Sequence, residues 1–320
     1  MHFDAALAVL GEGNVKAVTA QIGPHGHSRA LSAEPLEEKV RELIHRSFNP
    51  LRMSPLAALA VIVAWVSSTK VSADTGADPQ TSGGIFGAQT DVTLGLAAGV
   101  DQRYMGSNEF RPITLPLAAI HRGMFFVDAT RGVGAEFLAA SGFYVGQAFN
   151  YDFGRGIESS VLRPGSGNLR GMGDVAGTVT STLTVAQQIV RWLSINAQAE
   201  FAVGDHRGNQ YQFGLESTVL QTTKDSLVLD LDAKLGDSQY NLTYFGVTQA
   251  QSTTSVFSRF QPGSGIYAYS LAATWNHTLD KHWSTQLVVA GTRYTDVVEG
   301  SPIVESILGT TVLMSVNYAF

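Results

Sequence analysis

The last twelve residues of the chain, GTTVLMSVNYAF, alternate between two kinds of side chain, and this period of two limits most strongly what the chain can fold into. Every second residue from Val312 to Phe320 is apolar or aromatic, whereas the residues between them are mostly small or polar, with Leu313 as the exception. Successive side chains of a β-strand point to opposite faces of the sheet. The pattern therefore predicts a strand whose two faces meet different surroundings.

The same alternation recurs along the chain after Thr81. In the stretch SLVLDLDAKLG, Leu229 and Leu231 alternate with Asp230 and Asp232. Such segments are about ten residues or longer, the length of a tilted strand that crosses a bilayer, whereas strands of soluble proteins commonly have about five or six. The other segments of this kind are 89–100, 143–153, 175–186, 192–203, 210–220, 266–277 and 283–293.

The connections between these segments are short on one side and long on the other. Val190-Arg191 and Leu279-Asp280-Lys281 are short, while the long ones are rich in glycine or polar residues and cover 101–112, 154–174, 237–264 and 295–307. Outer-membrane barrels have short periplasmic turns and long outer loops. Because an open sheet edge in lipid would leave backbone groups unpaired, we expect a closed transmembrane antiparallel up-and-down β-barrel, an all-β fold.

The number of strands depends on three short pieces, 113–121, 123–129 and 132–140. The barrel has twelve strands if all of them belong to the wall, and ten if one hairpin lies outside it. Pro112 and Pro116 make the second strand the weakest prediction, since proline cannot donate to a sheet. In either case Phe320 would end the closing strand at the periplasmic rim.

Composition supports this fold and excludes several functions. Charged residues make up only 15% of the chain, against roughly 25% in typical soluble domains. Cysteine is absent, which excludes disulfides, thiolate metal sites and cysteine nucleophiles. The net charge is −6 without a basic run, so nucleic acid is not an expected partner. We also expect no cofactor and no metal.

Residues 53–73, MSPLAALAVIVAWVSSTKVSA, contain the one continuous apolar run of the chain. The run is shorter than the about 20 residues that a spanning helix needs, and it ends in Val71-Ser72-Ala73, which matches a signal-peptidase site. We expect a signal peptide cleaved after Ala73, a periplasmic leader over 74–84 and the barrel over 85–320; a buried core helix is the alternative. Because a signal peptide belongs at the start of a chain, residues 1–52 are expected to be an untranslated upstream extension or disordered.

Four motifs occur in order along the expected barrel. Residues 94–117 hold a glycine-rich strand, then Tyr-x-Gly-Ser and prolines, and 154–175 hold Gly-Arg followed by Leu-x-Gly-x-Gly-Asp. Residues 244–266 begin with Tyr-Phe-Gly-Val-Thr and end in a glycine-rich exit, and 301–304 read Ser-Pro-Ile-Val. Together these motifs resemble the MltA-interacting protein (MipA/OmpV) family of outer-membrane β-barrels over about residues 85–320.

The resemblance implies a role and a location. The protein would be a non-enzymatic scaffold in the outer membrane of a Gram-negative bacterium, inserted by the barrel-assembly machinery. Its partners would be a lytic transglycosylase and a peptidoglycan synthase. Other family members are associated with adhesion or with responses to antibiotics and osmotic conditions, so a surface adhesin that uses the outer loops is an alternative. The resemblance carries over no catalytic residue.

Three sets of candidate site residues follow from the pattern and the motifs. Inward charges would form either a network that plugs the lumen or a small-solute pore that prefers cations: Asp152, Glu200, Glu216, Asp230, Asp232 and Lys234. Loop-motif residues would form either a recognition surface or loop folds enforced by glycine and proline: Tyr104, Gly106, Ser107, Arg155, Tyr244, Phe245, Gly246, Val247, Ser301 and Pro302. Basic residues near the short turns would form a periplasmic rim: Arg122, Arg131, Arg191, Lys224 and Lys281.

An enzyme in such a barrel would need a cluster such as histidine with serine or aspartate at the rim. Among the histidines after Ala73, only His206 falls in an expected outer loop. Asp205 is its neighbour in sequence, but adjacency is not an orienting geometry. A solvated turn is the favoured interpretation, and we expect no catalytic residue.

Overall fold

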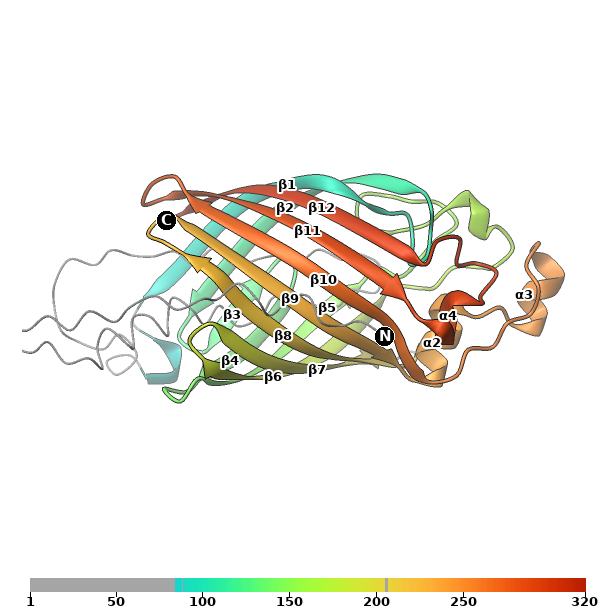
Figure 1. The fold of residues 1–320 in the computed structure, drawn as a ribbon, viewed down its shortest axis with the longest axis horizontal. Helices are drawn as coiled ribbons and strands as arrows, with labels where there is room; N and C mark the ends of the chain where they lie inside the picture. Colours follow the sequence, from blue (N-terminus) through green and yellow to red (C-terminus); the bar gives the residue numbers. More distant parts are fainter. Residues whose placement is uncertain (1–83, 88, 205–206) are drawn as a thin grey trace, which may run out of the picture.

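The computed structural model describes residues 84–87, 89–204 and 207–320. The expected extension over 1–52, the signal peptide over 53–73 and nearly all of the leader over 74–84 lie outside the described residues. The described chain forms a closed barrel in which β1 pairs with β12, and the expected twelve-stranded antiparallel β-barrel is confirmed (Figure 1). Its strands are β1 (Thr90–Gln102), β2 (Phe110–Arg122), β3 (Phe125–Asp128), β4 (Gly132–Leu138), β5 (Phe143–Asp152), β6 (Thr178–Val190), β7 (Leu193–Val203), β8 (Asn209–Gln221), β9 (Asp225–Gly236), β10 (Gly265–Thr278), β11 (Trp283–Tyr294) and β12 (Leu308–Ala319).

The helices are short and lie outside the wall strands. No helix in the described ranges is long and apolar enough to cross a membrane. The helical elements are η1 (Gly84–Phe86), η2 (Gly167–Leu169), α2 (Ser238–Phe245), α3 (Gln249–Thr254) and α4 (Asp296–Glu299).

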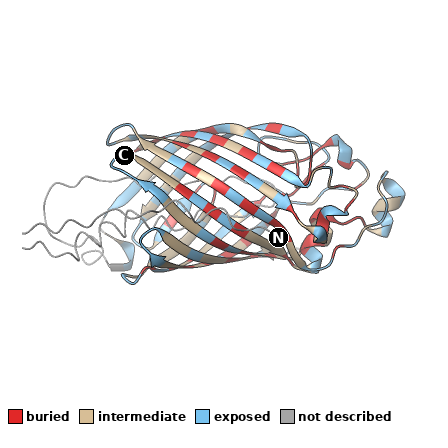
Figure 2. Ribbon diagram, in the orientation of Figure 1, coloured by how far each residue is buried: buried red, intermediate tan, exposed pale blue. Residues whose placement is uncertain are grey.

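The two faces of each strand differ in burial as the alternation predicts. Along β12, Leu313 and Ser315 are buried, whereas Met314 and Val316 between them are 55% and 40% exposed. Figure 2 shows the same alternation of buried and exposed positions along the other strands. Exposed apolar side chains on the outer face can meet lipid, and the ring is closed by backbone pairing between neighbouring strands, except where β2 and β5 extend beyond the short β3–β4 hairpin.

The two ends of the barrel have different connections. The end that holds the C-terminus has the turns 123–124, 139–142, 191–192, 222–224 and 279–282, and we call it the short-turn rim (Figure 1). At the opposite end lie the long connections 103–109, 153–177, 237–264 and 295–307, together with α2, α3 and α4. Phe320 follows β12 at the short-turn rim and is 65% exposed.

The hairpin of β3 and β4 is much shorter than its neighbours. β2 pairs with β1 along its full length, but it pairs with β3 only over Ala119–Arg122. We expected the turn at 130–131 to lie at the periplasmic rim, and this is wrong. The chain reverses direction at each turn, so the turn that follows β3 faces the long-loop end. This turn lies only partway along β2, because β3 has only four residues.

Candidate functional site

The expected lumen charges lie on the inward positions of β5, β7, β8 and β9. In the β8–β9 register, Glu216 lies directly opposite Asp230, so two carboxylates share one rung of the ladder. Lys234 lies two inward positions along β9 from Asp230. Asp152, Glu200, Asp230 and Asp232 are buried, and Glu216 and Lys234 are partly buried.

Uncharged side chains of neighbouring strands hold some of these carboxylates. Asp232 accepts hydrogen bonds from Gln212 Nε2 at 2.9 Å and from Ser270 Oγ at 3.3 Å. Glu200 accepts one from Thr182 Oγ1 at 3.4 Å. This side of the lumen therefore concentrates acidic groups among threonine, glutamine and serine, with Lys234 as a basic neighbour.

The other side of the lumen contains a buried apolar cluster, which we did not expect from the sequence. Inward-facing side chains from five adjacent strands form one buried cluster: Ala97, Ile113, Leu115, Ala272, Val288, Ala290 and Leu313. The sequence feature that indicates this cluster is the presence of apolar residues on both faces of strands such as β2. In β12, Leu313 is the one apolar residue among the small or polar inward positions. The lumen thus has a polar, acidic sector on β5–β9 and, on β10–β2, an apolar band that we call the apolar sector, flanked by buried polar residues such as Asp101, Ser270 and Asn317.

The four long connections pack on one another as an outer cap over the mouth of the barrel. One buried cluster contains residues of all four connections: Tyr104, Leu169 and Met172, Val247, and Ile303. A second cluster places α2 against the wall through Tyr240, Tyr244, Phe245, Tyr267, Tyr294 and Val298. Most of the loop-motif residues predicted as candidates are buried in this cap; Tyr104, Ser107, Arg155, Tyr244, Phe245, Val247 and Ser301 are at most 4% exposed.

Polar contacts between distant loops fix the outer cap. Arg155 Nη1 donates to the carbonyl of Tyr244 at 2.7 Å, and Ser301 Oγ donates to the carbonyl of Phe245 at 2.5 Å. Tyr104 Oη donates to the carbonyl of Ile303 at 3.1 Å. Burial raises the pKa of Tyr104, so its hydroxyl keeps the proton that it donates, and burial lowers the pKa of the Arg155 guanidinium.

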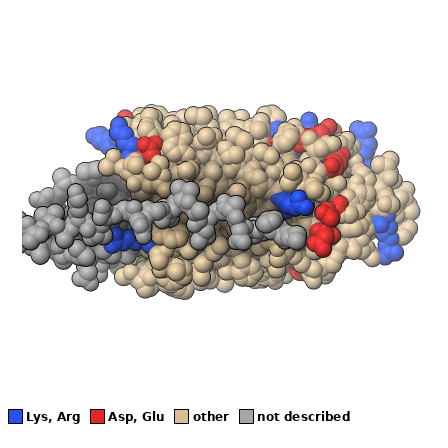
Figure 3. Space-filling view, viewed as in Figure 1, with Lys and Arg blue, Asp and Glu red and all other residues tan. Residues whose placement is uncertain are grey.

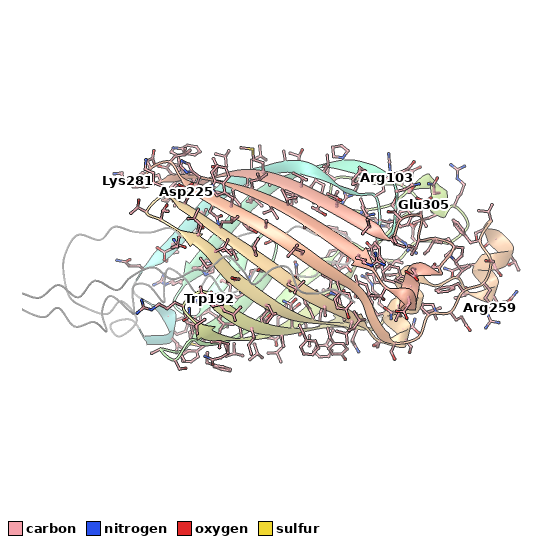
Figure 4. All side chains as sticks on the ribbon, in the orientation of Figure 1. Arg103, Trp192, Asp225, Arg259, Lys281 and Glu305 are labelled. Carbon is pink, nitrogen blue, oxygen red and sulfur yellow. The ribbon has the colours of Figure 1, made fainter. Side chains whose placement is uncertain are left out.

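The short-turn rim carries exposed basic side chains at four of the five predicted positions: Arg122, Arg191, Lys224 and Lys281. Figure 3 shows that, on the face in view, the visible charged side chains gather toward the two ends, and that the uncovered part of the wall between them shows none. Figure 4 places Lys281, Asp225 and Trp192 at this rim, and Arg103, Glu305 and Arg259 at the opposite end.

Two acidic residues beside these cations, Asp225 and Asp280, are engaged within the turns. Asp280 Oδ1 accepts the backbone N–H of His282 at 2.8 Å and that of Trp283 at 2.9 Å, and these bonds hold the pKa of Asp280 below its usual value. Asp225 Oδ1 accepts from Trp275 Nε1 at 3.0 Å and lies 2.8 Å from His277 Nδ1. The rim therefore presents its basic groups outward and uses these carboxylates internally.

Arg131, the fifth predicted position, does not belong to the rim. Its guanidinium pairs with Glu136 Oε2 at 2.6 Å and lies 3.9 Å from the ring centroid of Phe126. Tyr144 Oη also donates to Glu136 Oε2 at 3.0 Å, and His121 Nδ1 lies 3.5 Å from Glu136 Oε1. The prediction for Arg131 is wrong because its turn points toward the long-loop end and its side chain joins this partly buried network.

The lumen, the outer cap and the short-turn rim each offer a surface for binding. Among the residues that the structure describes, no group of three or more His, Cys, Asp or Glu side chains could hold a metal ion. His282 Nδ1 lies 2.7 Å from the carbonyl of Ala319, which ties the last turn to the end of β12. His206 lies outside the described residues.

Comparisons with known proteins find one family model and several solved structures. The family model described as MltA-interacting protein MipA matches residues 94–320. No curated protein matches the chain. Among solved structures, the chain is similar to a KdgM porin at 10% identity and TM-score 0.36, covering 71% of this chain and 99% of that chain. The CymD monoaromatic hydrocarbon channel is 9% identical at TM-score 0.37 over 72% and 88%, and OmpT of Vibrio cholerae is 7% identical at TM-score 0.34 over 73% and 98%.

Proposed function

This chain belongs to the MltA-interacting protein MipA family, and from that premise we propose that it is a non-enzymatic scaffold that holds peptidoglycan-remodelling enzymes at the outer membrane. The chain is an outer-membrane β-barrel. Its partners in this proposal are a lytic transglycosylase, to which the family name refers, and a peptidoglycan synthase. We further propose that they bind at the short-turn rim.

The observation that supports this site is the outward basic charge of the rim. Arg122, Arg191, Lys224 and Lys281 are exposed at one end of the barrel, while Asp225 and Asp280 are held in turn contacts. An acidic patch on a soluble partner would be steered toward such a rim. The attraction would weaken with salt, because exposed charges are screened over about 10 Å at 0.1 M.

The size of the rim is the physical difficulty, because the turns are short. A stable interface takes about 800 Å² from each partner, so several turns would have to act together. Segment 84–87 adds to this surface: the carbonyl of Ile85 accepts the N–H of Met124 at 3.1 Å, and Ile85 and Phe86 are 56% and 60% exposed. Trp192, in the β6–β7 turn, is 58% exposed and provides an aromatic anchor of the kind that dominates interfaces.

Charge reversal tests the proposal. Arg122, Arg191, Lys224 and Lys281 are changed to Glu together, and the variant is used to capture the purified transglycosylase and synthase at low and high salt. The matched control changes the exposed outer-end residues Arg170 and Arg259 to Glu. We expect the rim variant to lose capture and the control to keep it. If a folded rim variant still captures both enzymes to the same extent, the partners do not bind at this end of the barrel.

A cation-preferring pore is a second candidate, favoured by the acidic polar sector of the lumen. In planar bilayers it predicts ohmic steps whose cation preference weakens when Asp230 and Asp232 become Asn. The packed outer cap argues for a plugged barrel instead. Folded protein that gives no conductance would eliminate the pore.

An adhesin is a third candidate, and the protruding end of the 237–264 connection is its surface. Val256, just after α3, is 92% exposed. A variant in which the tip around α3 is shortened and α2 is kept tests the function of the outer end separately from that of the short-turn rim. If capture of the enzymes persists but binding of cells to a surface is lost, the outer loops carry an adhesive function.

A further inference from the structure

β2 has an unpaired edge in the outer half of the wall. Its pairing with β3 ends at Ala119, and the carbonyl of Ala118 accepts one more bond, from the N–H of Ala129 at 2.8 Å. Beyond that point, no backbone hydrogen bond joins residues 112–117 on this side to another described segment. β4 pairs with β5 only as far as Phe149. Two strands are therefore missing between the outer parts of β2 and β5; we call this interruption of the wall the β2–β5 notch.

Two prolines remove backbone donors from the notch. Backbone groups of successive strand residues point alternately to either side. Because the carbonyl of Ala118 points toward β3, Pro112, Thr114 and Pro116 point the same way along the unshifted β1–β2 register. Proline has no N–H, so only Thr114 of these three keeps a donor. An edge of this kind disfavours the addition of another strand.

Segment 157–163 of the β5–β6 connection lies beside this edge and is held to it by side chains. Arg111 Nη1 donates to the carbonyls of Ser160 and Val161 at 2.9 and 3.3 Å, and Arg103 Nη1 donates to Ser159 Oγ at 3.1 Å. The segment also exposes apolar side chains: Ile157, Val161 and Leu162 are 38%, 53% and 41% exposed. The border of the notch thus presents exposed apolar side chains beside the polar Glu158 and Ser160.

The inward face of β2 behind the notch carries apolar side chains next to the buried Arg111. Ile113 and Leu115 lie on the inward face of β2, between the prolines and beside the notch, and both belong to the apolar sector. The polar sector lies on the other side, where Thr182 and Gln212 are buried among the lumen acids. The unpaired edge therefore lies where the apolar part of the lumen is nearest to the bilayer.

We propose that the β2–β5 notch binds an acyl chain of an outer-membrane lipid, which enters between β2 and segment 157–163 and packs against Ile113 and Leu115. The edge keeps the carbonyls of Pro112, Thr114 and Pro116 and the N–H of Thr114, so the acyl chain occupies the notch over the apolar side chains, away from these backbone groups. Its transfer onto apolar side chains away from water is favourable. A β-strand from a second copy would need the donors that Pro112 and Pro116 lack.

Quenching from within the bilayer tests the site. The chain has no cysteine, so single cysteines can be labelled with bimane at Leu115, Ala290 and Thr182, three inward positions that are each 6% exposed. The full barrel is placed in phosphatidylcholine vesicles with or without bromine on the acyl chains, with lipid-facing Val100→Cys as the positive control. We expect bromine to remove most of the emission at Leu115→Cys, less at Ala290→Cys and little at Thr182→Cys.

Equal quenching at the three inward positions would overturn the proposal. So would a disulfide-linked dimer of Thr114→Cys, because a second copy would then occupy the edge. If the label at residue 115 prevents folding, the unsubstituted protein is photolabelled with phosphatidylcholine that carries a diazirine on its acyl chain. Adducts on Ile113 or Leu115 would support the site, and adducts confined to outward-facing residues would reject it.

Discussion

Arg207, in the connection after β7, forms an ion pair with Asp152 at the end of β5, and both side chains are only 4% exposed. Tyr244 of α2 completes the contact: its Oη donates to Asp152 Oδ2 at 3.0 Å and accepts from Arg207 Nη1 at 3.0 Å. The wall, an outer loop and the helix of the outer cap therefore meet at one buried polar group. This contact couples the stability of the barrel mouth to the position of α2.

Replacing Arg207 by Met should destabilise the protein strongly, because Asp152 would remain buried without its cation. Loss of one partner of a buried pair costs about 3–5 kcal/mol. The measurement is the free energy of unfolding in guanidinium chloride. The double variant Arg207→Met with Asp152→Asn should recover much of the loss, and an equal loss in both variants would show that the charge is not the cause.

Gly106 should not tolerate a side chain, although it lies in a loop. Its φ is +86°, and an added Cβ would lie 3.0 Å from Val304 Cγ2. Its carbonyl also accepts the N–H groups of Glu305 and Ser306 at 2.7 and 2.9 Å. Gly106→Ala should therefore cost about 1–3 kcal/mol and make the outer loops more sensitive to trypsin. Gly167→Ala is the control, because a Cβ there meets nothing within 4 Å; equal sensitivity would contradict the packed cap.

The two faces of β9 should respond differently to substitution. Leu229 is 36% exposed on the outer face and Asp230 is 3% exposed on the inner face. Leu229→Arg should cost roughly 2–4 kcal/mol if the residue lies near the middle of the membrane, while Leu229→Met and Asp230→Asn should cost much less. Unfolding of the protein in lipid vesicles measures the difference. Similar losses for Leu229→Arg and Asp230→Asn would mean that the faces are assigned wrongly.

The barrel should resist SDS until it is boiled. Its strands form a ring that is closed by the pairing of β1 with β12. No free edge runs the full height of the wall, so unfolding cannot begin from such an edge. Unheated and heated samples should migrate differently on a gel. A substitution that breaks the seam, such as Gly99→Val, where even a Cβ would lie 2.0 Å from the carbonyl of Val312, should abolish the fast-migrating folded form.

Much of the wall could be predicted from local patterns. The period of two identifies the outward and inward positions of β9 and β12, because neighbouring strand residues always point to opposite faces. The short and long connections indicate which end carries the cap. The motif residues Tyr104 and Tyr244 could be placed in outer loops, but their burial could not be predicted, since Tyr104 is held by Ile303 and Tyr244 by Arg155 across long stretches of chain.

What the sequence by itself determined is therefore the alternation of faces, the positions of the long strands and the family. Only the tertiary structure decided that β3 pairs with β2 over four residues, that the turn of Arg131 lies away from the rim with its side chain engaged by Glu136, and that the lumen has an apolar sector. Alternation is a local property of an extended backbone and is visible in any short stretch of residues. Register, loop packing and the contents of the lumen depend on contacts between residues far apart in the chain, so they appear only when the barrel closes.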